Sequence, residues 1–248
     1  MQAIDSARSL ADALGRPLCV PWAINPWCGA RFDQLFECPD VIGDFKTFAN
    51  DRDADAFVDQ HRSFIIDHYV PPFCDIPNAQ MATSLGDIGE LEKHPVIVIK
   101  SWARFHPTPV PFKLFMPIAA LRDRIASVTA TFDRTVGVHI RRTDHDDSRR
   151  ESPTAAFVRL MQESVTRGDA SDFFVATDDP AEEAELRRCF RIRSHPKRSL
   201  DRIAVEAIQD AVVDLFCLAA TSQIIGSAGS TFSIVAADLS GVPLIVAR

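Results

Sequence analysis

The hydrophobic pattern of the first half of the chain predicts a few scattered elements. Apolar residues at helical spacing predict an opening helix that ends at Gly15, with an inward face made of Ile4, Ala7, Leu10, Ala11 and Leu14. Strands are expected at Pro17–Trp22 and Pro95–Lys100, and a short helix at Phe32–Phe36. From Val41 to Ile88 the pattern is irregular and predicts no element.

From Thr135 onward, apolar runs alternate regularly with amphipathic segments. The predicted strands are 136–140, 172–177, 191–193, 222–226 and 243–246. The predicted helices are 153–168, 180–190, 203–220 and 230–239, with Ser152 and Asp179 as N-caps that each precede a proline. Strands joined by helices in this order form a parallel, doubly wound sheet, so the fold class is α/β.

A proline-rich stretch separates the two patterns. Its prolines are Pro107, Pro109, Pro111 and Pro117, a spacing typical of a passage between domains or a loop that lines a cleft. We therefore expect two α/β lobes, residues 1–117 and 118–248, with a cleft between them.

Composition narrows the classes of function. The chain has 248 residues, a net charge of −7 and 46% hydrophobic residues, which indicates a globular protein and argues against a non-specific nucleic-acid binder. Any phosphate site must then be a local basic pocket. A membrane-spanning run of about 18 apolar residues and a secretion signal are both absent from the sequence, so we expect a cytoplasmic protein. The six scattered cysteines predict reduced thiols rather than a zinc site.

Two arginines follow the apolar strand Val136–Ile140 directly. Arg141 and Arg142 stand where open α/β sheets bind ligands, and the guanidinium fork suits a diphosphate. Strand alternation places His139 and Arg141 on one side and Arg142 on the other, so one arginine should face the ligand and the other should brace a loop or a carboxylate. The alternative is a surface cluster of salt bridges.

Two neighbouring features have more than one interpretation. His139 lies inside the apolar run, where a hydrogen-bonded core histidine and a ligand contact fit the sequence equally well. The run Asp144–Asp147 contains metal-ligand residue types, but consecutive residues rarely converge on one ion, so a solvated turn is the favoured interpretation.

Three further positions carry candidate chemistry. Asp178 ends the strand at 172–177 and is placed to bind a sugar hydroxyl or to pair with an arginine. Asp214 lies late in an apolar helix, where the helix dipole disfavours an anion, so it either faces solvent or has a specific partner. The small residues of Gly226–Thr231 join a strand to a helix and would let backbone N–H groups approach an anion.

Taken together, three segments resemble the motifs of GDP-fucose-dependent fucosyltransferases. These are Gly137–Asp144, Phe174–Asp179, and Asp214–Phe216 with Ile225–Ser233. The α1,6-fucosyltransferases of N-glycan cores and nodulation factors are the most similar kind, and protein O-fucosyltransferases are more distant. Residues 14–18, Trp22 and 25–36 also resemble the early part of bacterial relatives.

This resemblance implies a GT-B-like fold of two Rossmann-like lobes, with a C-terminal lobe that binds GDP-fucose without a metal and an N-terminal lobe on the side of a glycan acceptor. By motif position, Arg141 would hold the β-phosphate, and His139 and Asp214 would lie by the guanine. The remaining implied donor contacts are Ser227, Ser230 and Thr231 in one loop and Asp178 in another. The residues implied in catalysis are Arg141, Arg142 and Asp144. The reaction would displace GDP from the sugar C1 with inversion.

In that family a strand and a loop with glycine and asparagine precede the helix at which this sequence opens. Two explanations stay open, a start site upstream of Met1 or a relative with impaired binding and catalysis. Besides a fucosyltransferase-like enzyme, the sequence is compatible with a non-catalytic nucleotide-sugar or glycan-binding protein. A third hypothesis is a metal-dependent phosphohydrolase that uses Asp144, His145 and Asp146.

Overall fold

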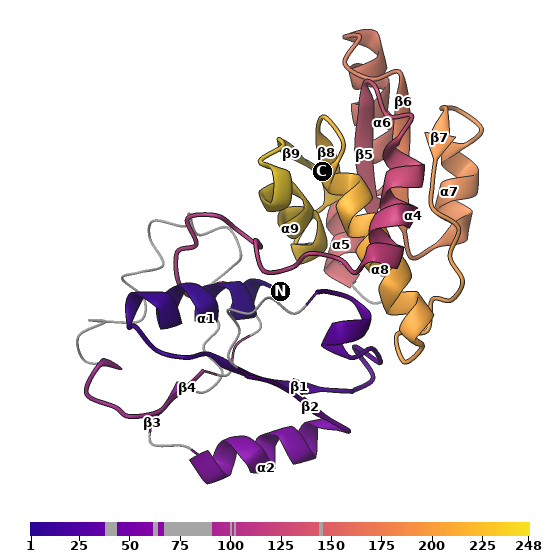
Figure 1. Ribbon diagram of the computed structural model, residues 1–248. Coiled ribbons are helices and arrows are strands. Elements are labelled where there is room, and N and C mark those ends of the chain that lie inside the picture. Colours follow the sequence, from indigo (N-terminus) through magenta and orange to yellow (C-terminus); the bar gives the residue numbers. More distant parts are fainter. Residues whose placement is uncertain (38–43, 62–63, 67–90, 100, 102, 144–145) are drawn as a thin grey trace. The chain divides into compact units, whose positions relative to one another are not determined.

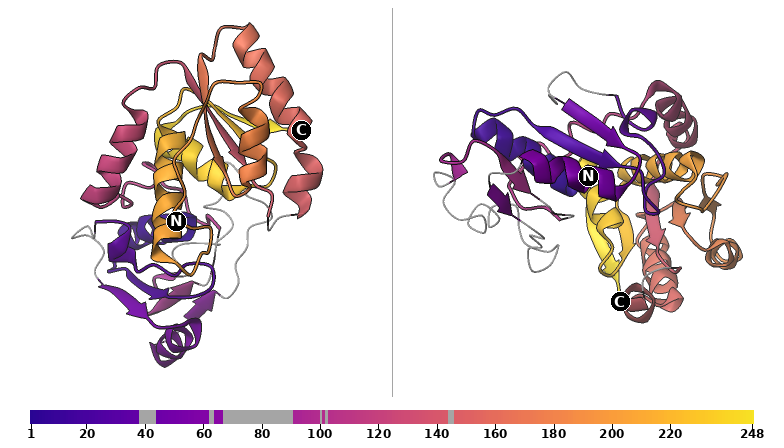
Figure 2. Two further views of the ribbon diagram at one scale, coloured as in Figure 1. Left: turned by 90° about the vertical axis from the view of Figure 1, so that its right-hand side faces the viewer. Right: turned by 90° about the horizontal axis from the view of Figure 1, so that it is seen from below.

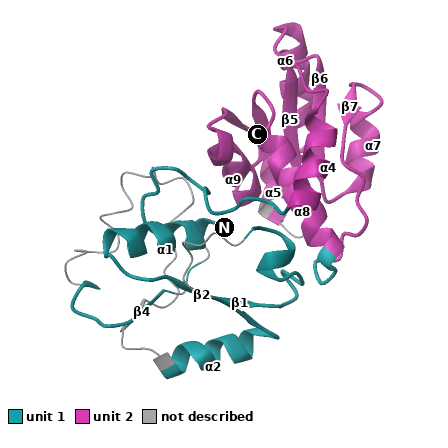
Figure 3. Ribbon diagram, in the orientation of Figure 1, with its two compact units in different colours: residues 1–118, 202–205 teal, residues 119–201, 206–248 magenta. Residues whose placement is uncertain are grey.

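The computed structural model describes residues 1–37, 44–61, 64–66, 91–99, 101, 103–143 and 146–248 (Figure 1). The chain divides into two compact units (Figure 3). The N-terminal unit is Met1–Ile118 with Arg202–Val205, and the C-terminal unit is Ala119–Asp201 with Glu206–Arg248. Each unit is described by itself.

The described part of the N-terminal unit contains two pairs of parallel strands and two helices. Its elements are α1 (Gln2–Ala13), β1 (Cys19–Ala23), β2 (Asp44–Phe48), α2 (Asp51–His61), β3 (Phe64–Ile66), β4 (Ile97–Ile99) and a short 3-10 helix at Phe32–Gln34. Strand β1 pairs with β2, and β3 pairs with β4. Helix α1 buries Leu10 against Leu91 and Phe105, and Gly15 ends it with a φ of 62°.

Polar groups on α1 fix the proline-rich segment. The hydroxyls of Ser6 and Ser9 donate to the carbonyls of His106 and Pro107, at 3.1 and 2.6 Å. The buried carboxylate of Asp5 accepts from the backbone N–H of Phe112 at 3.0 Å. These bonds satisfy backbone groups that the prolines leave without a regular partner, so a segment without helix or strand is still held in place.

The C-terminal unit is built on one parallel sheet. Its strands are β5 (Thr135–Ile140), β6 (Asp172–Thr177), β7 (Ile192–Arg193), β8 (Ile224–Ser227) and β9 (Leu244–Ala247). They lie in the order β7-β6-β5-β8-β9, which places β5 at the centre. Its helices are α4 (Ala119–Thr129), α5 (Asp146–Glu151), α6 (Thr154–Thr166), α7 (Pro180–Leu186), α8 (Val205–Ala219) and α9 (Thr231–Ser240). The doubly wound α/β prediction is confirmed.

Helices cover both faces of this sheet (Figure 2). Val138 and Ile140 point to the face where Phe157 of α6 and Leu186 of α7 complete the core. The opposite face carries Gly137, where an added Cβ would lie 3.0 Å from the Leu218 side chain of α8. Burial on both faces explains why the strands read as continuous apolar runs.

Several local predictions need correction. The prediction that Ser152 caps α6 is wrong, because the N-cap is Pro153 and the Ser152 hydroxyl donates instead to the carbonyl of Ala247 at 2.5 Å. The helix after Asp179 ends at Leu186 rather than Phe190. The solvated turn expected around Asp146 is instead the start of a short helix. The irregular stretch contains β2, α2 and β3, and α4 was also not predicted.

Candidate active site

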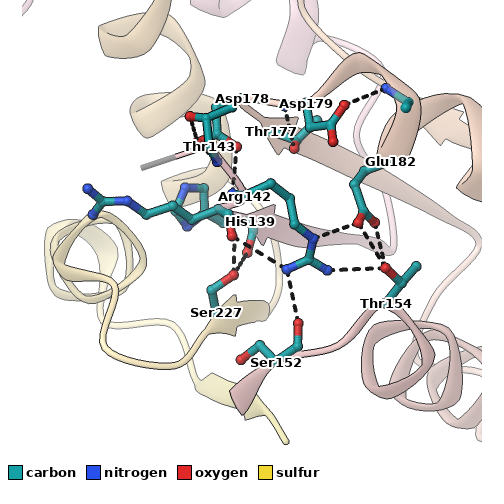
Figure 4. Close-up of polar contacts among 12 residues, drawn as sticks. His139, Arg142, Thr143, Ser152, Thr154, Thr177, Asp178, Asp179, Glu182 and Ser227 are labelled. Carbon is teal, nitrogen blue, oxygen red and sulfur yellow. Dashed lines mark hydrogen bonds and ion pairs between the residues drawn. The ribbon is translucent and has the colours of Figure 1, made fainter. Parts of the chain in front are cut away.

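Four of the candidate residues, His139, Arg142, Asp178 and Ser227, lie at the carboxyl ends of three neighbouring strands (Figure 4). Strands β6, β5 and β8 are adjacent and parallel, so their following loops meet at one edge of the sheet. The three motifs singled out in the sequence follow or end these strands, except for Asp214, which lies on α8.

Arg142 is a buried bracing residue. Its Nε donates to Glu182 of α7 at 2.5 Å, and its Nη1 and Nη2 donate to the carbonyl of Ser152 at 3.0 Å and the hydroxyl of Thr154 at 3.2 Å. The guanidinium also lies over the ring of Phe157, 5.7 Å from its centroid. The residue is 8% exposed, on the face that strand alternation predicted. These contacts give Arg142 the bracing role that one of the two arginines was expected to have.

Asp178 holds the loop that follows β5. Its carboxylate accepts from the backbone N–H of Arg142 at 2.8 Å and from the N–H and hydroxyl of Thr143 at 3.1 and 2.7 Å. Neighbouring Asp179 caps α7 through the N–H of Ala181 at 2.9 Å, as predicted. Asp178, directly after β6, therefore holds the backbone of the two residues that follow Arg141.

His139 is buried and hydrogen-bonded. Its Nδ1 lies 2.8 Å from the Ser233 hydroxyl and 3.4 Å from the Ser230 hydroxyl, and its ring stacks on Phe232 at 4.7 Å between centroids. Burial, and to a smaller extent the charges of Arg141 and Lys197, lower the pKa of His139 to about 4. The imidazole is therefore neutral at neutral pH and packs at the start of α9.

The loop between β8 and α9 is tied down by serines from α5 and from the strand ends. The Ser227 hydroxyl accepts from the backbone N–H of Arg141 at 3.0 Å and donates to the carbonyl of His139 at 3.3 Å. The Ser148 hydroxyl donates to the carbonyl of Ala228 at 2.7 Å, and the N–H of Ala228 donates to Ser152 at 2.8 Å. The loop backbone is thus held close to the end of β5.

Helix α9 begins at Thr231 without a side-chain cap. Ser230 occupies the N-cap position, but its hydroxyl lies toward His139 and makes no capping bond. The first N–H groups of a helix have no partner within the helix and carry partial positive charge. The backbone N–H of Arg141 donates to Ser227, so Arg141 lies beside the loop that leads into this helix start.

Asp214 has a specific partner that the sequence did not reveal. The carboxylate is 5% exposed and pairs with the ammonium of Lys197, whose Nζ lies 2.5 Å from Oδ2 and 2.6 Å from Oδ1. Burial raises the pKa of Asp214 to about 6, although Lys197 opposes the increase. The sequence signal was an anion late in α8, which was expected either to face solvent or to have a specific partner; the structure shows the partner.

A second carboxylate, Asp210, lies one helical turn earlier on α8. It accepts from the backbone N–H and Nε of Arg198 at 2.6 and 2.9 Å, and it forms an ion pair with Arg124 of α4. Arg124 also contacts Nε2 of His195 at 2.8 Å. Burial lowers the pKa of His195 to about 4. These residues fix the segment between β7 and α8 against the helix.

The acidic run after Thr143 is only partly described. Asp144 and His145 lie outside the described residues, and Asp146 forms an ion pair with Arg149. Among the described residues, no group of three histidine, cysteine or carboxylate side chains could hold a metal ion. In the same part of the chain, no helix has the length and apolar character needed to cross a membrane.

Solved structures with the same architecture include three from fucosyltransferases. NodZ alpha-1,6-fucosyltransferase soaked with GDP-fucose has a TM-score of 0.58 and 20% identity over 98% of this chain and 88% of its own. The chain has a fucosyltransferase-like fold. Fucosyltransferase NodZ from Bradyrhizobium gives a TM-score of 0.63 and 19% identity over 95% of this chain and 87% of its own. POFUT1 in complex with GDP-fucose has a TM-score of 0.60 and 15% identity, over 99% of this chain and 93% of its own.

These comparisons confirm the resemblance and the GT-B-like α/β fold class expected from the sequence motifs. No protein-family model matches the chain, and no curated protein sequence matches it. The fucosyltransferase-like fold is therefore identified by its backbone, and the roles expected of individual residues stay predictions.

Proposed function

We propose that this protein is a glycosyltransferase that moves fucose from GDP-fucose to a hydroxyl of a glycan. The observation that carries the proposal is the bond from the backbone N–H of Arg141 to Ser227, which places this arginine beside the loop that leads into the uncapped start of α9. A guanidinium beside a helix N-terminus is suited to a diphosphate. The fucosyltransferase-like fold supports fucose and guanine as the other parts of the donor.

In this proposal each candidate has a separate task. Arg141 and the N–H groups at Thr231 bind the β-phosphate, and Ser227 holds the backbone of Arg141. His139 and Asp214 lie by the guanine. Arg142 and Asp178 are positioning residues, because their polar contacts fix the loop after β5.

The reaction is a displacement at the sugar C1. The acceptor hydroxyl oxygen forms a bond to C1 on the face opposite the diphosphate, the bond from C1 to the β-phosphate oxygen breaks, and the configuration inverts. The bonding electrons leave with GDP, and the proton of the acceptor hydroxyl passes to the surrounding water. Positive charge placed at the departing oxygen lowers the barrier, and one such donor contributes about 2.7–4 kcal/mol. We propose that Arg141 and the backbone donors supply this charge without a divalent cation.

The two lobes would divide the substrates. We propose that residues 118–248 bind the donor and that residues 1–117 form the acceptor side. Support for the first part comes from the location of Arg141 and of the α9 start, since β5, β8 and α9 all belong to the C-terminal unit. The second part rests on the fold resemblance.

The test is fucose transfer by the purified full chain. GDP-fucose labelled in the sugar is incubated with an N-glycan core and with a nodulation factor, once in EDTA and once in magnesium, and the labelled glycan is quantified. We expect product in both buffers and none with Arg141→Ala. The exposed Arg159 of α6 provides the matched control, Arg159→Ala, which should retain full activity.

The other outcomes distinguish the alternatives. GDP binding without transfer to either glycan would favour a non-catalytic nucleotide-sugar-binding protein. Transfer only in magnesium would contradict the proposed metal independence. Full activity of Arg141→Ala would contradict the assignment of the phosphate site.

A further inference from the structure

The ion pair of Lys197 and Asp214 is unusually well enclosed. The side chain of Asp214 is 7% exposed and that of Lys197 is 22% exposed. Burying two charges is unfavourable unless the geometry is good and further hydrogen bonds satisfy the remaining donors. Here the ammonium contacts both carboxylate oxygens and also donates to the carbonyl of His195 at 3.1 Å.

The segment that carries Lys197 is held by the next turn of α8. Asp210 accepts from the backbone N–H of Arg198 at 2.6 Å, one residue after Lys197. Asp210 and Asp214 are four residues apart and therefore lie on the same face of the helix. One carboxylate fixes the backbone of the segment, and the other receives the ammonium.

Among the charges that act on the pKa of Asp214, Lys197 has the largest effect. Asp210 of α8 and Glu183 of α7 both act to raise the pKa of Asp214, in the same direction as burial. Lys197 is the opposing charge for this carboxyl. The neighbouring Cys217 thiol, with a pKa raised to about 12, stays neutral. His139, across the sheet edge on β5, is neutral because its pKa is lowered to about 4.

We propose that Lys197 is a positioning residue for recognition of the nucleotide base, because its ammonium keeps Asp214 ionised so that the carboxylate can accept from the ring N–H groups of guanine. This inference rests on the proposed function. An ionised carboxylate has two acceptor oxygens for the adjacent N1–H and N2–H donors of guanine, whereas a protonated carboxyl has one oxygen committed as a donor. A uracil base does not present this pair of donors.

The test is GDP binding measured by calorimetry between pH 6.5 and 8.5. The variants are Lys197→Met, Asp214→Asn and the control Arg188→Gln, which removes an exposed cation just after α7 and leaves the pair and its segment intact. Without Lys197 the pKa of Asp214 moves higher than about 6, so Lys197→Met should bind GDP more weakly than wild type at pH 7, by about twofold if the pKa rises by one unit and by about tenfold if it rises by two. The ratio of the two Kd values should fall as pH rises. The diphosphate of GDP also titrates in this range, but it affects both proteins equally and therefore cancels from the ratio of their Kd values at each pH.

The controls separate ionisation from loss of structure. Asp214→Asn should bind weakly at every pH, and Arg188→Gln should follow the wild-type profile. A Lys197→Met protein that binds GDP as well as wild type, or that is weaker by the same factor at every pH, would overturn the inference.

A ligand-free measurement keeps this inference distinct from the proposed function. A carboxyl with a raised folded-state pKa binds more protons in the folded state, so stability falls as pH rises through that pKa. Lys197→Met should therefore lose more thermal stability than wild type between pH 6 and 8.5, and the extra loss should disappear in Lys197→Met combined with Asp214→Asn. If wild type binds no GDP, the proposed function fails and the base-recognition role fails with it. An absent stability difference would instead reject Lys197 as the counter-ion.

Discussion

Arg142 and Glu182 form a buried ion pair at the carboxyl end of the parallel sheet, with 2.5 Å between Nε and Oε1 and side chains 10% and 13% exposed. The pair joins the loop after β5 to helix α7. The two adjacent arginines differ in their surroundings: the guanidinium of Arg142 is bonded inside the fold, whereas strand alternation places Arg141 on the other side of the sheet, where its backbone N–H donates to Ser227. Mutations at the two positions should therefore act on different properties.

Arg142→Ala should mainly lower stability. Removing one partner leaves Glu182 buried without its cation, which costs about 3–5 kcal/mol of unfolding free energy. Urea denaturation followed by circular dichroism measures the loss. The double variant Arg142→Met with Glu182→Gln should recover part of it, because no lone charge is then buried. A loss below about 1 kcal/mol for Arg142→Ala would show that the pair is not a structural brace.

Asp178→Asn should loosen the loop after β5. An amide offers one acceptor oxygen where the carboxylate accepts from Arg142 and Thr143 together, so at least one backbone N–H loses a charged partner. We expect a loss of about 1–2 kcal/mol and faster hydrogen exchange at those two amides. Unchanged exchange at both would contradict the role given to Asp178.

Gly226→Ala tests the close approach of β8 and α9. A Cβ at Gly226 would lie 2.5 Å from the Ser233 hydroxyl oxygen and 2.6 Å from its Cβ. Because a backbone or helix shift is needed to relieve this, we expect a loss of about 1–3 kcal/mol in urea denaturation. Gly226→Ala with Ser233→Gly should be less destabilised than the sum of the two single variants. Strict additivity would mean that the two residues do not meet.

Stability should depend on pH through His139. The folded-state pKa of about 4 lies below the 6.5 of an unperturbed histidine, so between these values the unfolded chain binds more protons. This contribution is complete above pH 6.5 and is lost as pH falls toward 4. His139→Asn should therefore lose less stability than wild type between pH 7 and 4.5, measured as the change in melting temperature. An identical slope for both proteins would contradict the burial of a neutral imidazole.

The C-terminal unit could be predicted from sequence because its signals are local. Strand β6 was predicted with the observed bounds Asp172–Thr177, since a buried parallel strand is a continuous apolar run between polar ends. The cap at Asp179 and the left-handed Gly241 after α9 are likewise fixed by their own residue types. Alternation along β5 correctly placed Arg142 on the Ile140 side of the sheet.

The errors come from contacts between residues distant in sequence. Serine is a residue type favoured at N-caps, but the hydroxyl of Ser152 donates to the carbonyl of Ala247, a residue at the far end of the chain. The sequence around Lys197 does not indicate its role, because its ion-pair partner Asp214 lies 17 positions later. Helix α2 was missed because its polar residues dominate a surface-exposed pattern. The contacts of Ser152 and Lys197 form only in the folded chain, so the hydrophobic periodicity of the sequence does not reveal them.

The most direct test of the central claim is the titration of GDP into the full-length protein in EDTA, with UDP as the comparison and Arg141→Ala as the variant. We expect one GDP to bind per chain, UDP to bind much more weakly, and Arg141→Ala to weaken GDP binding about 10- to 100-fold, as for the loss of charge-assisted hydrogen bonds. The melting temperature of the free variant checks that it is folded. Absence of GDP binding by wild type, or equal binding by Arg141→Ala, would contradict the assignment of the β5 end and the α9 start as a GDP-fucose site.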